Sequence, residues 1–154
     1  MTDSTFCPQM PLSRGQLVTV LYRMEGSPEI TGSSGFQDVA PNQYYTQAVA
    51  WAKENGMVNG VTDTLFRPAD SITREQFAAI LYRYANWKEQ DVTAQADLTS
   101  FADAAGVSAY AQIPMAWAVA EGLIQGISET TLSPRGTTTR AQAATILVRY
   151  LEQL

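Results

Sequence analysis

The sequence predicts an all-α protein built from internal repeats, and three copies of one short motif carry that prediction. A hydroxyl residue, an arginine, a variable residue and a glutamine precede an apolar run at residues 13–16, 73–76 and 139–142. The copies are separated by 73 − 13 = 60 and 139 − 73 = 66 residues. A motif that recurs at such spacings indicates a repeat architecture, and the period constrains the fold more strongly than any single element.

Each motif is the start of a helix. Ser or Thr followed three residues later by Gln is a capping box, in which each side chain satisfies a backbone N–H of the other residue. Ser13, Thr73 and Thr139 are therefore predicted N-caps of helices over 14–24, 73–86 and 139–152. Apolar residues follow at helical spacing, so each helix must bury one stripe. The stripes comprise Leu17, Val20 and Leu21; Phe77, Ile80, Leu81 and Tyr84; and Ala143, Ile146, Leu147 and Tyr150.

Two further helices are predicted over 44–55 and 110–121. They carry Trp51 and Trp117, which are 66 residues apart, and Pro114 falls in the first turn of the later helix, where a missing N–H is harmless. Each is preceded by a Phe-x-Asp segment, with its acid at Asp38 or Asp103. A turn or cap role is favoured for these carboxylates over paired acid–base chemistry.

The chain is predicted to be one domain over 1–154, with two full repeats and the second half of an earlier one. The pieces are the half-repeat at 1–26, repeats at 36–86 and 101–154, and linkers at 27–35 and 87–100. The first half of the earlier repeat is expected before residue 1 or not at all. A helical piece within 92–98 is one interpretation of the second linker.

Composition excludes several classes of function. A net charge of −5 disfavours nucleic acid as a partner, and the absence of histidine removes the commonest general base and metal ligand. One cysteine excludes an intramolecular disulfide. There is no apolar run long enough to span a membrane, and the first residues lack the pattern of a signal peptide. We therefore expect no cofactor, no metal and no membrane partner.

The arginines of the three motifs, Arg14, Arg74 and Arg140, are the leading candidates for ligand binding. Each occupies the first position of its helix, where a cation is mildly unfavourable beside the positive end of the helix dipole. A guanidinium fork matches a carboxylate, and the N–H groups of a helix N-terminus add to such a site. The alternative is a structural arginine that donates to backbone carbonyls of the next repeat.

Four other repeated residues are weaker candidates for ligand binding. Trp51 and Trp117 could stack on a sugar ring, although core packing is favoured because they lie in apolar stretches. Gly60 and Gly126 could let a ligand approach the backbone, or could serve a turn through positive φ or close approach. A second arginine set recurs nine residues after the motif arginines and is interpreted as structural or solvated. This set comprises Arg23, Arg83 and Arg149.

In fixed order, these elements resemble the S-layer homology (SLH) family. The resemblance extends from Phe6 to about Tyr150. It rests on the Phe-x-Asp segments, the tryptophan helices, the Gly-x-x-x-Gly loops, the Phe-Arg-Pro element ending at Pro68 and the three Ser/Thr-Arg-x-Gln boxes. Each motif alone is weak, but their repeated order is specific.

The resemblance implies a pseudo-threefold domain with a central bundle of three capped helices and grooves between repeats. It also implies non-covalent anchoring of a bacterial surface protein to an anionic, often pyruvylated, cell-wall polysaccharide. The family's motif arginine contacts that ligand, which maps to Arg14, Arg74 and Arg140. This sequence departs by having glutamine where the family motif has glutamate, at Gln16, Gln76 and Gln142, and by lacking the first half-repeat.

The resulting expectation is an extracellular, cell-wall-bound binding module rather than an enzyme. The main alternative is a helical scaffold or protein-binding module, whose arginines would be tied up internally with no groove beside them. A glycosidase using two carboxylates is disfavoured, because no carboxylate stands outside the repeat pattern in a suggestive setting.

The incomplete repeat also predicts an open edge. Three capped helices are present, but only two tryptophan helices are available to cover them, so one should expose apolar groups. The linker at 86–100, a homodimer contact or a preceding segment of a parent protein could cover this edge. We expect the isolated chain to self-associate.

Overall fold

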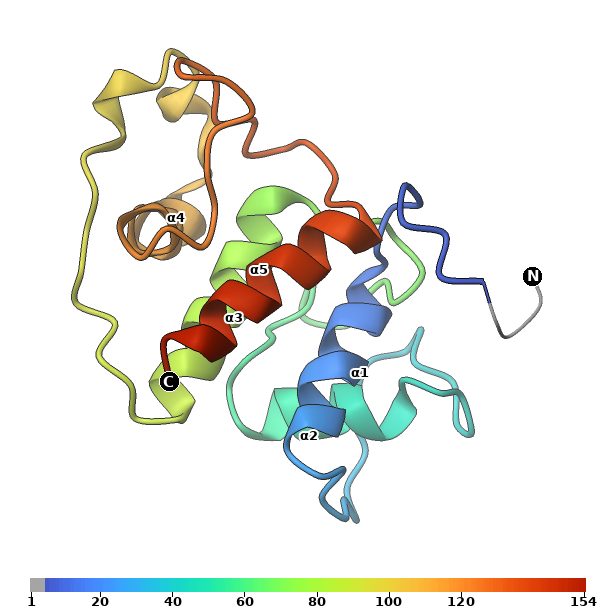
Figure 1. Cartoon of the computed structure of the whole chain (residues 1–154). Coiled ribbons are helices and arrows are strands. Elements are labelled where there is room, and N and C mark those ends of the chain that lie inside the picture. The colour runs from blue at the N-terminus through green and yellow to red at the C-terminus, as the bar shows by residue number, and fades with distance from the viewer. Residues whose placement is uncertain (1–4) are drawn as a thin grey trace. The chain divides into compact units, whose positions relative to one another are not determined.

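The structure, a computed structural model, describes residues 5–154 and is all-helical, as predicted (Figure 1). The expectation that the chain has no signal peptide rests partly on residues 1–4, which lie outside the described residues. Within 5–154 the secondary structure comprises α-helices and short 3₁₀ turns, with isolated β-bridges and no strand. The α-helices are α1 (Arg14–Met24), α2 (Thr46–Glu54), α3 (Arg74–Trp87), α4 (Gln112–Ala120) and α5 (Arg140–Glu152).

All three predicted capping boxes form, which fixes where α1, α3 and α5 begin. Ser13 accepts from the backbone N–H of Gln16, whose side-chain oxygen accepts from the N–H of Ser13. The same reciprocal pair is present at the heads of α3 and α5. Helix starts are thus set by local chemistry that the sequence contains.

The chain folds as two compact units, and their boundaries fall half a repeat away from the repeats of the sequence. The small unit is Ser13–Ser71, and the large unit combines Met1–Leu12 with Ile72–Leu154. In the small unit α1 packs against α2, and in the large unit α3 packs against α4. A capped helix therefore packs with the tryptophan helix of the following repeat. The predicted single domain and central three-helix bundle stay predictions.

The predicted stripes are buried in α3 and shifted in α1. Phe77, Ile80, Leu81 and Tyr84 are all buried, whereas Val20 is 37% exposed. In α1 the buried face is turned toward Val18, which is fully buried together with Leu17 and Leu21.

The predicted helical piece at 92–98 is wrong, because only the 3₁₀ turn Leu98–Ser100 forms there. The rest of this linker runs extended beside α4, where the N–H of Ala96 donates to the carbonyl of Ala116 at 3.0 Å. This hydrogen bond gives the N–H of Ala96 a partner although no helix forms there. The linker therefore follows α4, apart from a contact with α5 in which the Tyr150 hydroxyl donates to the side chain of Gln90. Val148 and Leu151 of α5 stay exposed, so the linker does not cover that face, contrary to one of the expected ways of covering the edge.

Candidate ligand-binding site at the motif arginines

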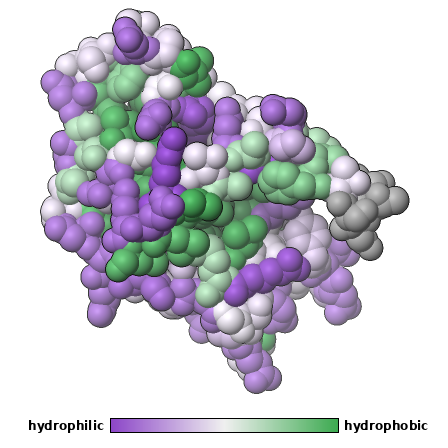
Figure 2. All heavy atoms as spheres, viewed as in Figure 1, coloured by the Kyte–Doolittle hydropathy of each residue, from purple (hydrophilic) through white to green (hydrophobic). Residues whose placement is uncertain are grey.

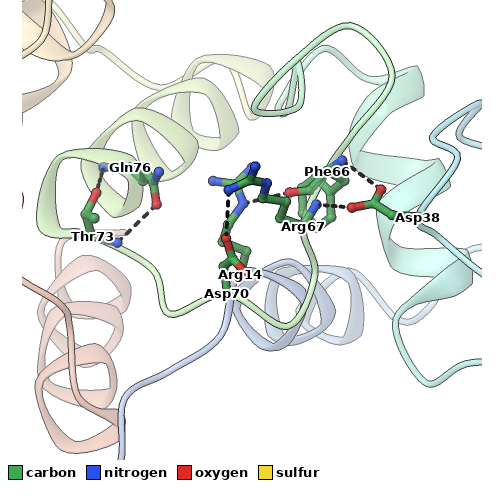
Figure 3. Close-up of polar contacts among 7 residues, drawn as sticks. All are labelled: Arg14, Asp38, Phe66, Arg67, Asp70, Thr73 and Gln76. Atoms are coloured by element: carbon green, nitrogen blue, oxygen red, sulfur yellow. Dashed lines mark hydrogen bonds and ion pairs between the residues drawn. The ribbon is translucent and has the colours of Figure 1, made fainter.

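Arg14 connects the start of α1 to a loop more than fifty residues further along the chain. Its Nε donates to the carbonyl of Phe66 at 2.9 Å, and its guanidinium lies 4.8 Å from the centre of the Phe66 ring. Its backbone N–H donates to the carbonyl of Asp70 (Figure 3). The side chain is only 5% exposed. Arg14 is thus a buried link between a helix N-terminus and a loop.

The other two motif arginines make the same kind of link. Arg74 donates through Nε to the carbonyl of Leu132 at 2.9 Å and through Nη2 to the carbonyl of Gln125. Arg140 donates through Nη1 to the carbonyl of Phe6 at 3.0 Å. In each repeat the acceptor belongs to the apolar-x-Pro loop that precedes a capping box. These contacts match the structural alternative considered for the motif arginines.

The helix N-termini themselves are occupied, which corrects the expectation that their N–H groups add to an anion site. At α3, the N–H groups of Arg74 and Glu75 donate to the carbonyls of Gly136 and Pro134, and that of Gln76 donates to Thr73. Loop carbonyls bring partial negative charge to the positive end of the dipole. This arrangement offsets the unfavourable placement of arginine at the first helical position.

Asp38 and Asp103 hold the same loops from the other side. They do so by long-range bonds to loops 28 to 30 residues further along the chain, whereas a local turn or cap role was predicted. The carboxylate of Asp38 accepts from the N–H groups of Phe66 and Arg67 at 2.9 and 2.7 Å (Figure 3). Asp103 accepts from Leu132 and Ser133 at 2.8 and 2.7 Å. These two backbone bonds lower the pKa of Asp103, with a smaller contribution from the charge of Arg74. The carboxylates are therefore structural clamps.

Gly60 and Gly126 are explained by packing within their own loops. A Cβ on Gly60, which has φ +81°, would lie 2.4 Å from the carbonyl oxygen of Thr62 and 2.6 Å from the Phe36 ring. A Cβ on Gly126 would lie 2.3 Å from the carbonyl oxygen of Ser128 and 2.7 Å from the equivalent phenylalanine ring. Close approach is thus common to both positions, and positive φ is found at Gly60. Ligand contact by these glycines stays a prediction.

Trp51 and Trp117 are 2% and 3% exposed and lie in the cores of the two units. Trp51 packs against Tyr22 with ring centroids 5.7 Å apart, and Trp117 packs against Tyr82 at 5.6 Å. Both pairs join a capped helix to a tryptophan helix. The favoured core role is confirmed, while stacking of either ring on a sugar stays a prediction.

A pocket of about 260 Å³ opens beside Arg74 in the large unit. It lies between α5 and the loop that follows α4, and a second arginine, Arg149, contributes to its lining. Arg149 donates to the carbonyl of Leu123 at 3.4 Å. The remaining lining residues are Leu123, Ile124, Gln125, Ala141, Gln142, Thr145 and Ile146. The pocket thus has two cationic groups and no carboxylate in its lining.

Sequence reasoning found Arg74 but not its pairing with Arg149. Nine helical steps separate Arg149 from Arg140, so it lies on the far side of α5 from its own motif arginine. That side of α5 faces Arg74, the motif arginine of the preceding repeat. The sequence alone does not indicate this neighbour. Burial lowers the pKa of Arg74, and Asp103 opposes that change. An arginine nonetheless remains charged at physiological pH.

Glu75 is a buried carboxylate that the sequence analysis missed. It is 5% exposed and accepts from the N–H and the hydroxyl of Ser108 at 2.9 and 2.7 Å. It occupies the variable position of the motif, where the other copies have Gly15 and Ala141, so the repeat gave no signal for it.

Neither a metal centre nor a membrane span is found in the part of the chain that the structure describes. Residues 5–154 contain no group of three acidic or thiol side chains arranged to hold a metal ion. None of their helices is long and apolar enough to cross a membrane.

Comparison with known proteins identifies the repeats. The family model for the S-layer homology domain matches residues 35–78 and 100–144, which together are more than half of the chain. Each match begins before a Phe-x-Asp segment and ends inside a capped helix. The matched units are the two full repeats recognised in the sequence.

Three relatives are similar in sequence to the chain over nearly its whole length. An amylopullulanase of Thermoanaerobacterium thermosulfurigenes and an exoglucanase of Acetivibrio thermocellus are each 31% identical to it over 99% of the chain. A surface-layer 125 kDa protein of Lysinibacillus sphaericus is 31% identical over 99%. The chain spans 8%, 14% and 13% of these proteins, respectively. With its two matched repeats and this segment shared with two enzymes and a surface-layer protein, the chain belongs to the family of S-layer homology domains, which anchor proteins at the bacterial cell surface.

Proposed function

We propose that this domain anchors its protein to the bacterial cell wall by binding an anionic secondary polysaccharide, and that the pocket of Arg74 and Arg149 receives an acidic group of that polymer. The observation that carries the proposal is one open pocket lined by two arginines and by no carboxylate. The segment is shared by relatives named as two different enzymes and a surface-layer protein, which supports a role separate from catalysis.

The chemistry of the pocket favours a carboxylate, such as that of a pyruvyl ketal on a sugar. Arg74 spends Nε and Nη2 on backbone carbonyls, and a guanidinium has five N–H donors in all. Those two bonds hold the group in place, so little side-chain entropy is lost when an anion binds.

The scaffold alternative accounts for part of the observations. It predicts internally bonded arginines, which are found in all three motifs, and no groove beside them. The pocket beside Arg74 favours binding at that site, whereas Arg14 and Arg140 are secondary candidates. In this proposal Arg74 is both a structural link and a ligand contact.

The experiment compares sedimentation of the chain with purified Gram-positive cell walls before and after extraction of their secondary polymer. Binding to intact walls and loss of binding to extracted walls is the expected result. The Arg149→Ala variant should bind about 10- to 150-fold more weakly, since a hydrogen bond to a charged group contributes about 1.5–3 kcal/mol. Arg149→Lys should recover little of this loss, because lysine lacks the fork.

The matched control is Arg135→Ala, which removes the same charge from an exposed loop position outside the pocket. If Arg135→Ala and Arg149→Ala weaken binding equally, net charge rather than the pocket is responsible. Equal binding to intact and extracted walls would favour the scaffold alternative.

A further inference from the structure

Helix α5 is a capped helix without a tryptophan helix on it among the described residues. The other two capped helices are each covered: α1 by α2, and α3 by α4. In each covered pair a tyrosine of the capped helix meets the tryptophan, through Tyr22 in one case and Tyr82 in the other. The residue of α5 at this repeat position, 66 residues after Tyr82, is Val148, and it is 52% exposed.

An apolar stripe surrounds Val148 on the exposed side of α5. Ala144, Val148 and Leu151 are spaced four and three residues apart, so they lie on one face of the helix. All three are exposed, and Leu151 is 47% exposed. Helix α5 lies at the front of Figure 1, and Figure 2 shows hydrophobic residues gathered over it. An apolar stripe of this kind normally lies against a partner.

The same repeat positions on α3 are buried. Ala78 and Ala85, the counterparts of Ala144 and Leu151, are both fully buried. Because α3 and α5 share the same cap and the same period, the difference lies in what covers them. On α3 the cover is α4.

A second, independent difference between the repeats is found in the loop that contacts the start of α5. In the two later loops a carboxylate accepts from two successive backbone N–H groups: Asp38 from residues 66 and 67, and Asp103 from residues 132 and 133. The corresponding pair in the first loop belongs to Phe6 and Cys7. No carboxylate of residues 5–154 accepts from either N–H group.

The first loop has nevertheless the same conformation as the other two. Cys7 has φ 47°, close to the values of 56° and 55° for Arg67 and Ser133 at the same repeat position. Its Phe6 carbonyl accepts from a motif arginine, as in the other loops. The Phe6 side chain, however, is 57% exposed, whereas its counterpart Phe66 is fully buried. The loop therefore has the conformation of the clamped loops, while no carboxylate of residues 5–154 clamps it.

We propose that these two features form one docking face for a polypeptide segment of defined chemistry. We call it the open face and define it by Ala144, Val148 and Leu151 together with the N–H groups of Phe6 and Cys7. Its partner is a Phe-x-Asp turn followed by a tryptophan-bearing amphipathic helix, the chemistry that residues 36–58 and 101–124 display. The aspartate accepts from Phe6 and Cys7, and the helix covers the stripe on α5.

A second copy of this chain is a poorer partner than such a segment. Both tryptophan helices of the chain are already packed, α2 on α1 and α4 on α3. A second copy would have to uncover one capped helix to cover another. Docking therefore calls for a segment whose tryptophan helix is not already packed.

The test uses a fluorescent peptide with the sequence of residues 101–124, titrated with the full chain and followed by fluorescence anisotropy. Saturable binding is expected. Val148→Glu in the chain should weaken it at least about tenfold, because it buries an unpaired charge. Asn at the position of Asp103 in the peptide should also weaken it. Val20→Glu, at an exposed valine of α1, is the matched control and should bind normally.

A free peptide that must fold in order to bind has a lower measured affinity for the chain. A second measurement therefore tests the same contact without this difficulty. The same segment is joined by a flexible linker to the N-terminus of the chain, which raises its effective concentration. The fusion should unfold at a higher temperature than the chain alone, and Val148→Glu should abolish the gain. The proposal is overturned if neither the peptide nor the fused segment responds to Val148→Glu. A dimer of the unmodified chain that Val148→Glu disperses, and that the peptide does not displace, would also overturn it in favour of self-association.

Discussion

The Nε of Arg74 donates to the carbonyl of Leu132 at 2.9 Å, across 58 residues of sequence. This bond joins the start of α3 to the loop that precedes the next capping box. Arg14 makes the equivalent bond in the small unit, so the repeat encodes a recurring link between a helix N-terminus and a distant loop. The motif arginine is thus conserved within the chain for a structural reason as well as for any ligand.

Loss of this link should destabilise the fold. Arg74→Ala leaves the carbonyls of Leu132 and Gln125 without a donor at a site that is 7% exposed. We expect the free energy of unfolding to fall by about 1.5–3 kcal/mol, measured by urea denaturation. Arg135→Ala, an exposed position, should change it by less than about 0.5 kcal/mol. Equal stability of the two variants would contradict the structural role.

Asp103 should make stability depend on acid pH. Its pKa in the folded state is lowered from the ordinary value of 3.8, mainly by the N–H groups of Leu132 and Ser133. A lowered folded-state pKa stabilises the fold above the unfolded pKa, and this contribution is lost as pH falls through the folded value. Stability should therefore decline below about pH 4.

The Asp103→Asn variant isolates that contribution. It should be less stable than the parent at neutral pH and should lose less stability between about pH 5 and about pH 2. Asp63→Asn, on an exposed loop, should retain the parent's pH dependence. A slope unchanged by Asp103→Asn would show that the clamp does not govern acid unfolding.

Gly60→Ala should be destabilising because the turn has no space for a Cβ. The positive φ and the approach of Thr62 and Phe36 both oppose the substitution. We expect a loss of roughly 1–3 kcal/mol in the free energy of unfolding. Gly32→Ala is the control, since nothing lies within 4 Å of its Cβ position. Thermal denaturation of both variants measures the difference, and similar melting temperatures would refute the packing explanation of Gly60.

The helices were predictable because their signals are local. The capping boxes contain both partners within four residues, so Ser13 and Gln16 reveal α1 without any knowledge of its neighbours. The tryptophan helices were found from residues that recur 66 positions apart, and the burial of Trp51 and Trp117 agrees with their predicted core role.

The site was only partly predictable because its contacts are distant in sequence. The acceptor of Arg14 lies 52 residues away, so the motif alone could not decide between a ligand and a loop carbonyl. Arg149 reaches the pocket of Arg74 through the packing of α5 beside the loop that follows α4. Nothing in the helical position of Arg149 indicates that neighbour.

The open edge was foreseen from a count of helices, and the structure places it on α5. Val148 and Leu151 are exposed there, in agreement with the expected apolar patch, and self-association stays a prediction. That no carboxylate among residues 5–154 accepts from Phe6 and Cys7 was not foreseen, since the clamps of Asp38 and Asp103 become evident only once the loops are seen in place.

The proposed anchoring depends most directly on recognition of an acidic group by the pocket of Arg74 and Arg149. Isothermal titration with a pyruvylated cell-wall sugar and the same sugar without its ketal measures this recognition. We predict binding of the pyruvylated sugar alone, weakened roughly 10-fold or more in Arg149→Ala and unchanged in Arg135→Ala. Equal binding of the two sugars, or unchanged affinity in Arg149→Ala, would contradict it.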